Sequence, residues 1–371
     1  MIEPKPDFER LLTALTCSGE PDRVPLAELG ISYEVMSGFM GAPVTCFEEA
    51  VRFFEKAGYD YLKVTPLYDW NPERRVPKEG VRSATGQFSA NTEDEIQIRY
   101  ASEGAGVITS MDEFETYPWM DVEDVDYSVY QKANDLLPDG MRIIGHQGDI
   151  FTQGWTLMGF ETLSWKMMDE PELVEAVMNK TGEIIYSIFE VIAEQENIGA
   201  LWISDDIAYT EGLMVSPIFL REHVFPWFKR IGNLARGLGV PYLYHSDGDL
   251  WQVMPDLLDD IGFNALQPIE PKAMDIRELK QKIGDRVCLI GNLDLGYTLT
   301  RGTPEEVVEE TKGLIRDVAP GGGYCVGSSN TVPYYVPAGN YKAMVEATLE
   351  FGRYPIEFRV LSNPAGVWSG D

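Results

Sequence analysis

The side chains of this sequence that could do chemistry centre on its three histidines. His245 and Asp247 are one residue apart in the segment YLYHSDG, and a tight turn there would point both side chains to the same side. A His-x-Asp pair can bind a divalent ion through nitrogen and oxygen, or it can orient the imidazole for proton transfer. His146 lies in a similar segment, GHQGD, whereas His223 lies in a helical segment where packing is expected.

Further polar side chains stand at the ends of apolar segments, where they could bind a substrate or an ion. These residues are Glu28, Asp149, Asp205, Asp206, Glu270, Asn292, Asp294, Ser328 and Asn330. Aromatic residues could wall a pocket beside them, although packing is the commoner use of such rings. The aromatic candidates are Tyr68, Trp70, Trp155 and Tyr209.

Eight apolar segments are the predicted strands that carry these residues. They cover 23–30, 60–65, 142–149, 200–206, 241–248, 264–270, 286–294 and 323–330. The last five each precede a helical segment, and their unbroken apolar character indicates strands buried on both faces of a parallel sheet. Eight such units predict an α/β fold of the (β/α)8 TIM-barrel type, with catalytic residues at the carboxyl ends of the strands. The alternative is a doubly wound open sheet, but no glycine-rich phosphate loop follows any strand.

The segment 66–140 is a predicted insertion after the second strand. It contains a predicted β-hairpin around IQIRYASEG and then an acidic helical run. An insertion of this length is the expected lid or partner surface. The whole chain, 1–371, is predicted to form a single domain with a tail at 361–371.

The composition excludes several classes of protein. The 371 residues carry 60 acids against 30 Lys and Arg, and the net charge of −30 disfavours sequence-independent binding to nucleic acid. The first residues lack the basic and apolar regions of a signal peptide, and no apolar run reaches membrane-spanning length. The four cysteines form no C-x-x-C pair, so we expect a cytoplasmic protein away from membranes. A homodimer is compatible with the sequence.

Four segments resemble successive blocks of the uroporphyrinogen decarboxylase superfamily, a single-domain (β/α)8 fold. They are WISDDIAYTEGLMVSPIFLREHVFPWFKRI, PYLYHSDGDLWQVMPDL, LIGNLDLGYTLTRGTPEEV and APGGGYCVGSSN. The resemblance covers most of the chain. True decarboxylases of this superfamily carry an Arg-rich segment near the N-terminus that binds substrate carboxylates. Here that region is DRVPLAELGISYEVMSG, with Glu28 where the basic loop should begin and no Arg until Arg52.

The other branch of the superfamily comprises cobalamin-linked methyltransferases, and resemblance to it implies a zinc site. That site is built from His-x-Cys after the fifth strand and a Cys after the eighth. In this sequence His245 is kept, Asp247 replaces the first Cys, and Asn330 or Ser329 stands where the second would be. A zinc site of His245, Asp247 and Glu270 would be harder and less thiophilic, which favours oxygen-bearing substrates over thiols.

These observations favour a corrinoid-linked methyltransferase. It would move a methyl group from a small methoxylated substrate to the cobalt of a separate corrinoid protein, with zinc as Lewis acid. The predicted catalytic residues are His245, Asp247, Asp206 and His146. The predicted substrate-binding residues are Glu28, Asp149, Asp205, Tyr209 and Asn330.

Two alternatives stay open at this point. One is a metal-independent decarboxylase of a tetrapyrrole, in which Asp205 or Asp206 protonates the ring. The other is a non-catalytic barrel that binds a corrinoid or its carrier protein.

Overall fold

The computed structural model describes residues 4–68, 83–85, 97–99 and 106–357. Its central sheet has seven parallel strands in the order β1-β4-β5-β8-β9-β10-β11. They are β1 (Tyr61–Val64), β4 (Arg142–Gly148), β5 (Ile198–Ser204), β8 (Tyr242–His245), β9 (Ala265–Gln267), β10 (Cys288–Ile290) and β11 (Tyr324–Cys325). Each of the seven lies within or overlaps a predicted strand, and all of their apolar residues except Ile198 are buried, as the unbroken apolar runs predict.

The remaining predicted strand, 23–30, closes the circle between β11 and β1. Leu26 forms a parallel bridge with Val326, just after β11. On the other side the Tyr61 hydroxyl of β1 donates to the main-chain oxygen of Glu28 (2.7 Å) and accepts from its main-chain nitrogen (2.9 Å). The strands follow one another around the barrel in chain order. In a doubly wound sheet, by contrast, the order in which strands are added reverses at the middle of the sheet. The fold is therefore the predicted (β/α)8 barrel.

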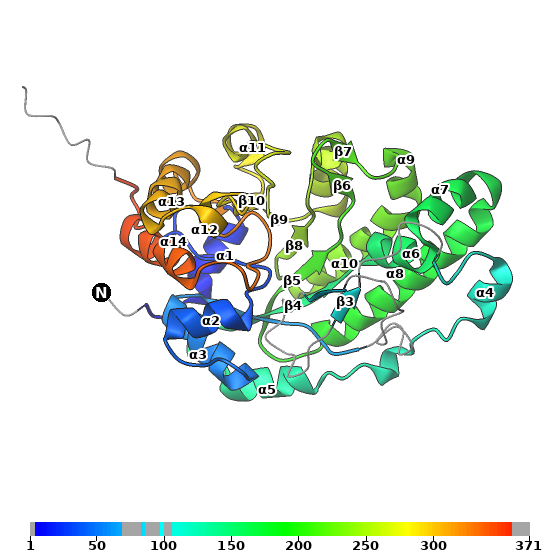
Figure 1. The fold of residues 1–371 in the computed structure, drawn as a ribbon, viewed down its shortest axis with the longest axis horizontal. Helices are drawn as coiled ribbons and strands as arrows, with labels where there is room; N and C mark the ends of the chain where they lie inside the picture. The colour runs from blue at the N-terminus through cyan, green and yellow to red at the C-terminus, as the bar shows by residue number, and fades with distance from the viewer. Residues whose placement is uncertain (1–3, 69–82, 86–96, 100–105, 358–371) are drawn as a thin grey trace, which may run out of the picture.

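Helices follow the strands and cover the outside of the barrel (Figure 1). They are α1 (Phe8–Leu15), α2 (Tyr33–Met40), α3 (Phe47–Ala57), α4 (Met111–Thr116), α5 (Ser128–Leu136), α6 (Ile150–Met158), α7 (Phe160–Asp169), α8 (Pro171–Ala193), α9 (Pro217–Phe219), α10 (Phe225–Leu238), α11 (Ile276–Ile283), α12 (Thr298–Arg301), α13 (Pro304–Val318) and α14 (Ala338–Phe351). Among the described residues, none of these helices has both the length and the apolar character that crossing a membrane requires.

Local sequence signals explain where several helices begin and end. Thr303 caps α13 in a capping box, because its hydroxyl accepts from the Glu306 amide (3.3 Å) while the Glu306 carboxylate accepts from the Thr303 amide (2.7 Å). Gly239 ends α10 at a φ of +71°, a conformation that glycine adopts without strain. A threonine before the first helical turn and a glycine after the last one are thus the local signals of these two boundaries.

The insertion 66–140 leaves the barrel between β1 and β4. Two short strands in it, β2 (Ser83–Thr85) and β3 (Gln97–Arg99), pair antiparallel, as the predicted hairpin requires. Helices α4 and α5 follow before the chain enters β4. Trp70, the rest of the hairpin region and the predicted tail lie outside the described residues.

Candidate metal centre and active site

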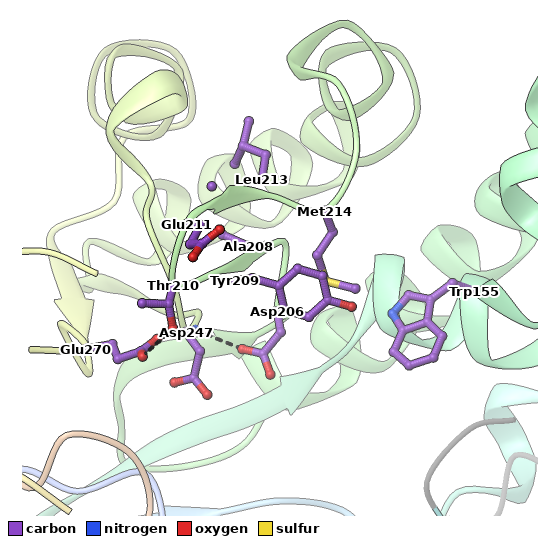
Figure 2. A pocket seen from close by; sticks show the side chains of 11 residues that line it. Trp155, Asp206, Ala208, Tyr209, Thr210, Glu211, Leu213, Met214, Asp247 and Glu270 are labelled. Atoms are coloured by element: carbon purple, nitrogen blue, oxygen red, sulfur yellow. Dashed lines mark hydrogen bonds between the residues drawn. The ribbon is translucent and has the colours of Figure 1, made fainter. Parts of the chain in front are cut away.

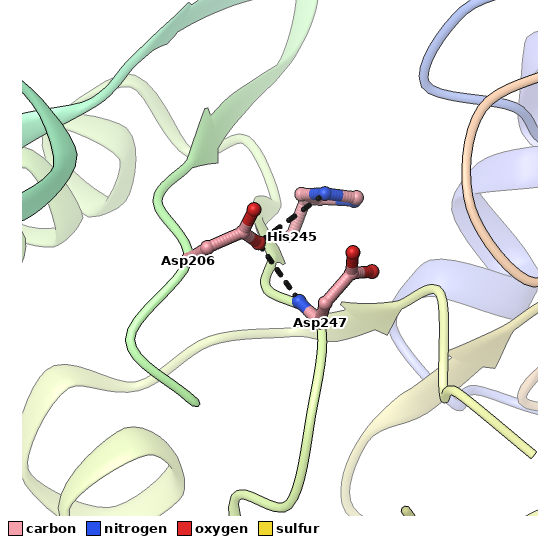
Figure 3. Close-up of side chains that lie close together, drawn as sticks. All are labelled: Asp206, His245 and Asp247. Carbon is pink, nitrogen blue, oxygen red and sulfur yellow. Dashed lines mark hydrogen bonds and ion pairs between the residues drawn. The ribbon is translucent and has the colours of Figure 1, made fainter. Parts of the chain in front are cut away.

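The ends of β5 and β8 bring Asp206, His245 and Asp247 together (Figure 3). One ligand atom from each lies within 4.8 Å of the other two. His245 Nε2 is 3.7 Å from Asp206 Oδ1, and the same oxygen accepts from the Asp247 amide at 2.9 Å. Ser204, at the end of β5, is the register partner of His245 on β8, so neighbouring parallel strands place the two acids beside the imidazole. The turn after His245 thus directs the His-x-Asp pair as the sequence predicts.

A glutamine on the next strand fixes the His245 ring, which is buried. Gln267 Oε1 contacts Nδ1 of His245, while Gln267 Nε2 donates to the main-chain oxygen of Asn330 at 3.0 Å. The Gln267 oxygen can only accept, so Nδ1 carries the proton and Nε2 presents its lone pair toward Asp206. This is the tautomer that a metal-binding histidine needs.

Asp247 has one carboxylate oxygen held and one without a partner. Asn330 Nδ2 donates to Oδ2 at 2.6 Å, whereas Oδ1 is buried and has no hydrogen-bond partner within the described part of the chain. Burial raises the pKa of Asp247 to about 6, with Asp206 and Glu270 adding to the rise and His245 opposing it. A divalent cation fits this centre, because it would take the orphaned oxygen, the Asp206 carboxylate and the free lone pair of His245.

The turn that carries Asp247 packs directly against a hairpin, β6 (Ala208–Tyr209) and β7 (Gly212–Leu213). The Asp249 amide donates to the main-chain oxygen of Tyr209 at 3.0 Å. Gly248 has a φ of +86°, and a Cβ built there would lie 2.5 Å from that same oxygen. Glycine is required at this position by both conformation and space, so the H-S-D-G segment fits closely beneath the hairpin.

A pocket of about 750 Å³ opens beside the Asp206–His245–Asp247 cluster, the candidate metal centre (Figure 2). Its lining residues are Trp155, Asp206, Ala208, Tyr209, Thr210, Glu211, Gly212, Leu213, Met214, Asp247 and Glu270. Asp206 and Asp247 therefore belong to both the centre and the pocket. Trp155 and Tyr209, two of the aromatic candidates, are among the lining residues, and Tyr209 is 59% exposed. The pocket combines apolar walls with acids that could face a metal ion.

Glu270 lines the pocket but is not one of the three clustered residues. Its carboxylate accepts from the Thr210 hydroxyl of the hairpin at 2.7 Å (Figure 2). Asp206, predicted from the sequence as a catalytic residue, is the third member of the cluster. Glu270 as a metal ligand stays a prediction.

Asp205, the neighbour of Asp206, is fully buried and faces the start of α6. Its carboxylate accepts from the amides of Ile150 (2.8 Å), Phe151 (2.6 Å) and Thr152 (2.9 Å). Burial raises the pKa of Asp205, while these amides oppose the rise by stabilising the charged form. Both oxygens are engaged by the main chain, so Asp205 anchors α6 to β5, and a substrate contact through it stays a prediction.

His146 and Asp149, at the end of β4, share Ser204 as a partner. Ser204 Oγ donates to Asp149 Oδ1 at 3.0 Å and lies 3.2 Å from His146 Nε2, and His146 Nδ1 lies 2.9 Å from Thr65 Oγ1. Because the serine has one proton to give, His146 donates from Nε2 and accepts at Nδ1. Burial, Lys63 and His245 hold the pKa of His146 well below its usual range, so the ring is a neutral hydrogen-bonding group. Burial and the acids Asp205 and Asp206 raise the pKa of Asp149.

Glu28 is buried beneath the last barrel strand. Ser328 donates to its carboxylate from both amide and hydroxyl, each at 2.7 Å. Burial raises the pKa of Glu28 to about 8, and the two hydrogen bonds oppose that rise. Glu28 as a substrate-binding residue stays a prediction.

Two other predicted strand-end residues form hydrogen bonds with the main chain. Asn292 donates to the main-chain oxygen of Ile269, and Asp294 accepts from the Gly296 amide in its own turn.

Sequence reasoning missed Gln267, the residue that orients His245. Its signal is a polar side chain inside the otherwise apolar segment NALQPIE, on the strand that follows the histidine strand. Polar side chains within a buried parallel strand are uncommon and need a partner. Here the partner is His245 at the end of the neighbouring strand β8.

Comparison with known proteins identifies the relatives of this chain. Residues 107–351 match the family model described as uroporphyrinogen decarboxylase (URO-D). A methylated-thiol–coenzyme M methyltransferase of Methanosarcina mazei is 25% identical over 206 residues, which cover 54% of this chain and 51% of the relative. A uroporphyrinogen decarboxylase of Anaeromyxobacter dehalogenans is 26% identical, with 58% and 60% covered.

A third relative and one solved structure extend the comparison. The methylcobamide:CoM methyltransferase MtaA of Methanosarcina barkeri is 25% identical, with 58% of this chain and 59% of the relative covered. The chain thus spans between half and three fifths of the length of these curated relatives. The structure of a methyltransferase from Methanosarcina mazei superposes with a TM-score of 0.63 over 92% of this chain and 98% of that one, at 21% identity, which shows a shared fold.

Proposed function

The chain belongs to the uroporphyrinogen decarboxylase family, and from that membership we propose that it is a corrinoid-linked methyltransferase. Its substrate would be a small methoxylated compound, and the acceptor would be the reduced cobalt of a corrinoid on a separate protein. Two relatives whose names state methyl transfer support the reaction class. The substrate, the metal and the partner are our proposals.

The observation that carries the proposal is the Asp206–His245–Asp247 centre at the edge of the pocket. It offers one nitrogen and two carboxylate oxygens, and Asp247 Oδ1 is buried without a hydrogen-bond partner among the described residues. These residues would hold zinc, which when bound polarises an ether oxygen as a Lewis acid. An alkoxide or phenoxide leaves poorly without such help.

The chain's own residues prepare the site for that reaction. Gln267 holds the His245 tautomer, and Asn330 holds the Asp247 carboxylate. Trp155 and Tyr209 would enclose the methoxylated substrate in the pocket. In the reaction the methyl–oxygen bond would break, and its electron pair would stay on oxygen. The reduced cobalt would supply the electron pair of the new cobalt–carbon bond to the methyl group.

The donor set favours oxygen substrates over thiols. Among the described residues, the centre contains no cysteine, and Cys288 and Cys325 are buried in the barrel wall with their sulfurs 3.8 Å apart. Carboxylate ligands make a harder metal centre than thiolates do. A harder centre suits the oxygen of an ether.

The decarboxylase alternative fits the pocket less well. Five relatives carry that name, but this pocket is lined by Asp206, Glu211, Asp247 and Glu270. Four acids would repel a substrate that carries many carboxylates. A small methoxylated substrate with at most one carboxylate would meet less repulsion.

The proposal is tested by metal analysis followed by a methyl-transfer assay. The purified protein should contain about one zinc per chain. With free cob(I)alamin and a panel of methoxylated compounds, the absorbance of cob(I)alamin should fall for at least one donor. Tetrapyrrole decarboxylation by metal-free protein would contradict the proposal, and tight corrinoid binding without turnover of any donor would assign the chain a binding role instead.

A further inference from the structure

Lys63 is a buried cation that has no anionic partner among the described residues. It lies in the middle of β1 and is 8% exposed, and within the described part of the chain it makes no hydrogen bond or ion pair. The other two buried cations differ, because Arg10 and Arg23 both face Asp60, at 2.5 and 3.5 Å. Asp60, three residues before Lys63, thus pairs with both arginines, whereas no described residue pairs with Lys63.

The Lys63 side chain faces the interior of the barrel. On β4, a Cβ at Gly145 would meet Ile192 of the outer helix α8, so the next residue, His146, faces inward. The ring of His146 contacts the hydroxyl of Thr65. Lys63 is two residues before Thr65 on an extended segment, and it therefore shares that inward side.

The interior position places Lys63 on the same line of residues as the metal centre. Strands β1, β4, β5 and β8 are consecutive in the barrel and carry Lys63, His146, Ser204 and His245 in that order. His146 bonds Ser204, and Ser204 is the register partner of His245. The electrostatic influence of both Lys63 and His245 reaches the His146 ring. The line thus runs from Lys63 at one end to His245 at the other.

An unpaired cation in this position is costly for folding. Transfer of an ammonium group out of water without a counter-charge is strongly unfavourable, and burial lowers the pKa of Lys63 to about 7 as a result. A hydrophobic residue at the same place in the apolar segment DYLKVT would avoid that penalty. A bound anion would supply the missing counter-charge.

We propose that Lys63 binds the carboxylate of the substrate, so that the methyl donor is a methoxylated carboxylic acid. This inference rests on the proposed methyltransferase function. The acid group would pair with Lys63 beside the neutral His146, and the methoxy oxygen would face Asp206 and Asp247. One ammonium group at this place suits one negative charge, whereas a phosphate dianion or a polycarboxylate would need more counter-charge than Lys63 supplies.

Binding of matched acid and amide ligands tests the inference without turnover. The probes are 4-methoxybenzoate with 4-methoxybenzamide, and methoxyacetate with methoxyacetamide, titrated calorimetrically into the zinc-loaded full chain. We expect at least one acid to bind about tenfold or more tightly than its amide. Equal binding of acid and amide in both pairs, or binding of neither acid, would overturn the inference with the wild-type protein alone.

Variants then assign the preference to Lys63. Lys63→Met should remove the acid preference while leaving amide binding and zinc content unchanged, and Lys63→Arg should retain much of it. Lys63→Met should unfold at the same urea concentration as the wild type or a higher one, because it removes an unpaired buried charge. An acid preference that survives in Lys63→Met would refute the assignment, and if that variant fails to fold, Lys63→Gln is titrated in its place.

The two proposals fail in different ways. A Lys63-dependent acid preference without methyl transfer to cob(I)alamin would leave the carboxylate site standing and refute the methyltransferase function. The opposite result is methyl transfer at equal rates from amide and acid donors, in wild type and Lys63→Met alike. It would support the methyltransferase function and refute the carboxylate site.

Discussion

Side chains of the same chemical type have different roles in this barrel. Of the three histidines, His245 presents Nε2 to two acids, His146 is a neutral hydrogen-bonding group, and the His223 ring packs on Phe219 with centroids 4.7 Å apart. In His245 and His146 the difference arises from the group that contacts Nδ1, which is the Gln267 side-chain oxygen in His245 and the Thr65 hydroxyl in His146. Partner identity, rather than residue type, decides which histidine can bind a metal ion.

Substitution of His245 should abolish metal binding. His245→Ala removes the only nitrogen ligand among the clustered residues, so we expect zinc content to fall from about one per chain toward zero and methyl transfer to fall at least about 100-fold. His223→Ala is the matched control and should keep both. Elemental analysis and the cob(I)alamin assay measure the two effects. Full zinc content in His245→Ala would place the metal elsewhere.

Glu28 should make stability depend on pH. Burial raises its pKa to about 8 in the folded state, whereas the unfolded carboxyl titrates near 4.5. Between those values the folded state binds a proton that the unfolded state has released, so the free energy of unfolding contains a Glu28 contribution that falls as pH rises, by at most about 1.4 kcal/mol per pH unit. Glu28→Gln should show a flatter profile in urea denaturation between pH 5 and 8. Identical profiles would mean that Glu28 is ionised in the folded protein.

At the level of the secondary-structure elements, two consecutive acids at the carboxyl end of β5 have different roles. Asp205 turns back to cap α6, while Asp206, whose side chain is 48% exposed, faces His245 and the pocket. Consecutive residues at a strand end point to opposite sides, which explains the division. One acid joins a helix to the barrel, and the other is free to act on a ligand.

Paired substitutions should separate these two roles. Asp205→Ala leaves the amides at the start of α6 without an acceptor, so it should lower the free energy of unfolding by about 2–4 kcal/mol in urea denaturation. Asp206→Ala should cost less than about 1 kcal/mol but lower zinc affinity. Comparable stability losses in the two variants would contradict the division of roles.

The barrel elements were predictable because each strand is an unbroken apolar run followed by a helix signal. The sequence did not reveal that segment 23–30 joins the chain just after β11 by one isolated bridge, Leu26 to Val326, since bridging depends on the path of the neighbouring strand. Within the site, the His245–Asp247 pair follows from its spacing. The separate roles of Asp205 and Asp206, and the partnership of Gln267 with His245, depend on contacts across strands that sequence spacing does not encode. Lys63 had a visible signal, a lysine inside an apolar strand.

At the scale of the whole molecule, the net charge of −30 opposes the approach of an anionic substrate. Long-range repulsion lowers the rate of association, whereas the local contact with Lys63 would stabilise the complex once the substrate is bound. The two effects differ in their sensitivity to salt, because dissolved ions screen distant charges far more than buried ones.

Salt should therefore speed the reaction of an acid donor. Raising the ionic strength from about 0.01 to 0.15 M shortens the Debye length from about 30 to 8 Å. We expect kcat/KM for 4-methoxybenzoate to rise at least about threefold and that for 4-methoxybenzamide to stay constant. Steady-state kinetics at the two salt concentrations measure this difference. A fall in kcat/KM for the acid donor would indicate that attraction by local cations dominates its approach.

The most direct test of the account is a single-turnover reaction with a methoxylated acid whose methyl carbon is ¹³C. Zinc-loaded protein and cob(I)alamin should yield ¹³C-methylcobalamin and an equal amount of the demethylated alcohol or phenol, detected by NMR. Metal-free protein and His245→Ala should yield neither. Equal transfer by zinc-loaded and metal-free protein, or no transfer to cobalt from any methoxylated donor at full zinc occupancy, would contradict the account.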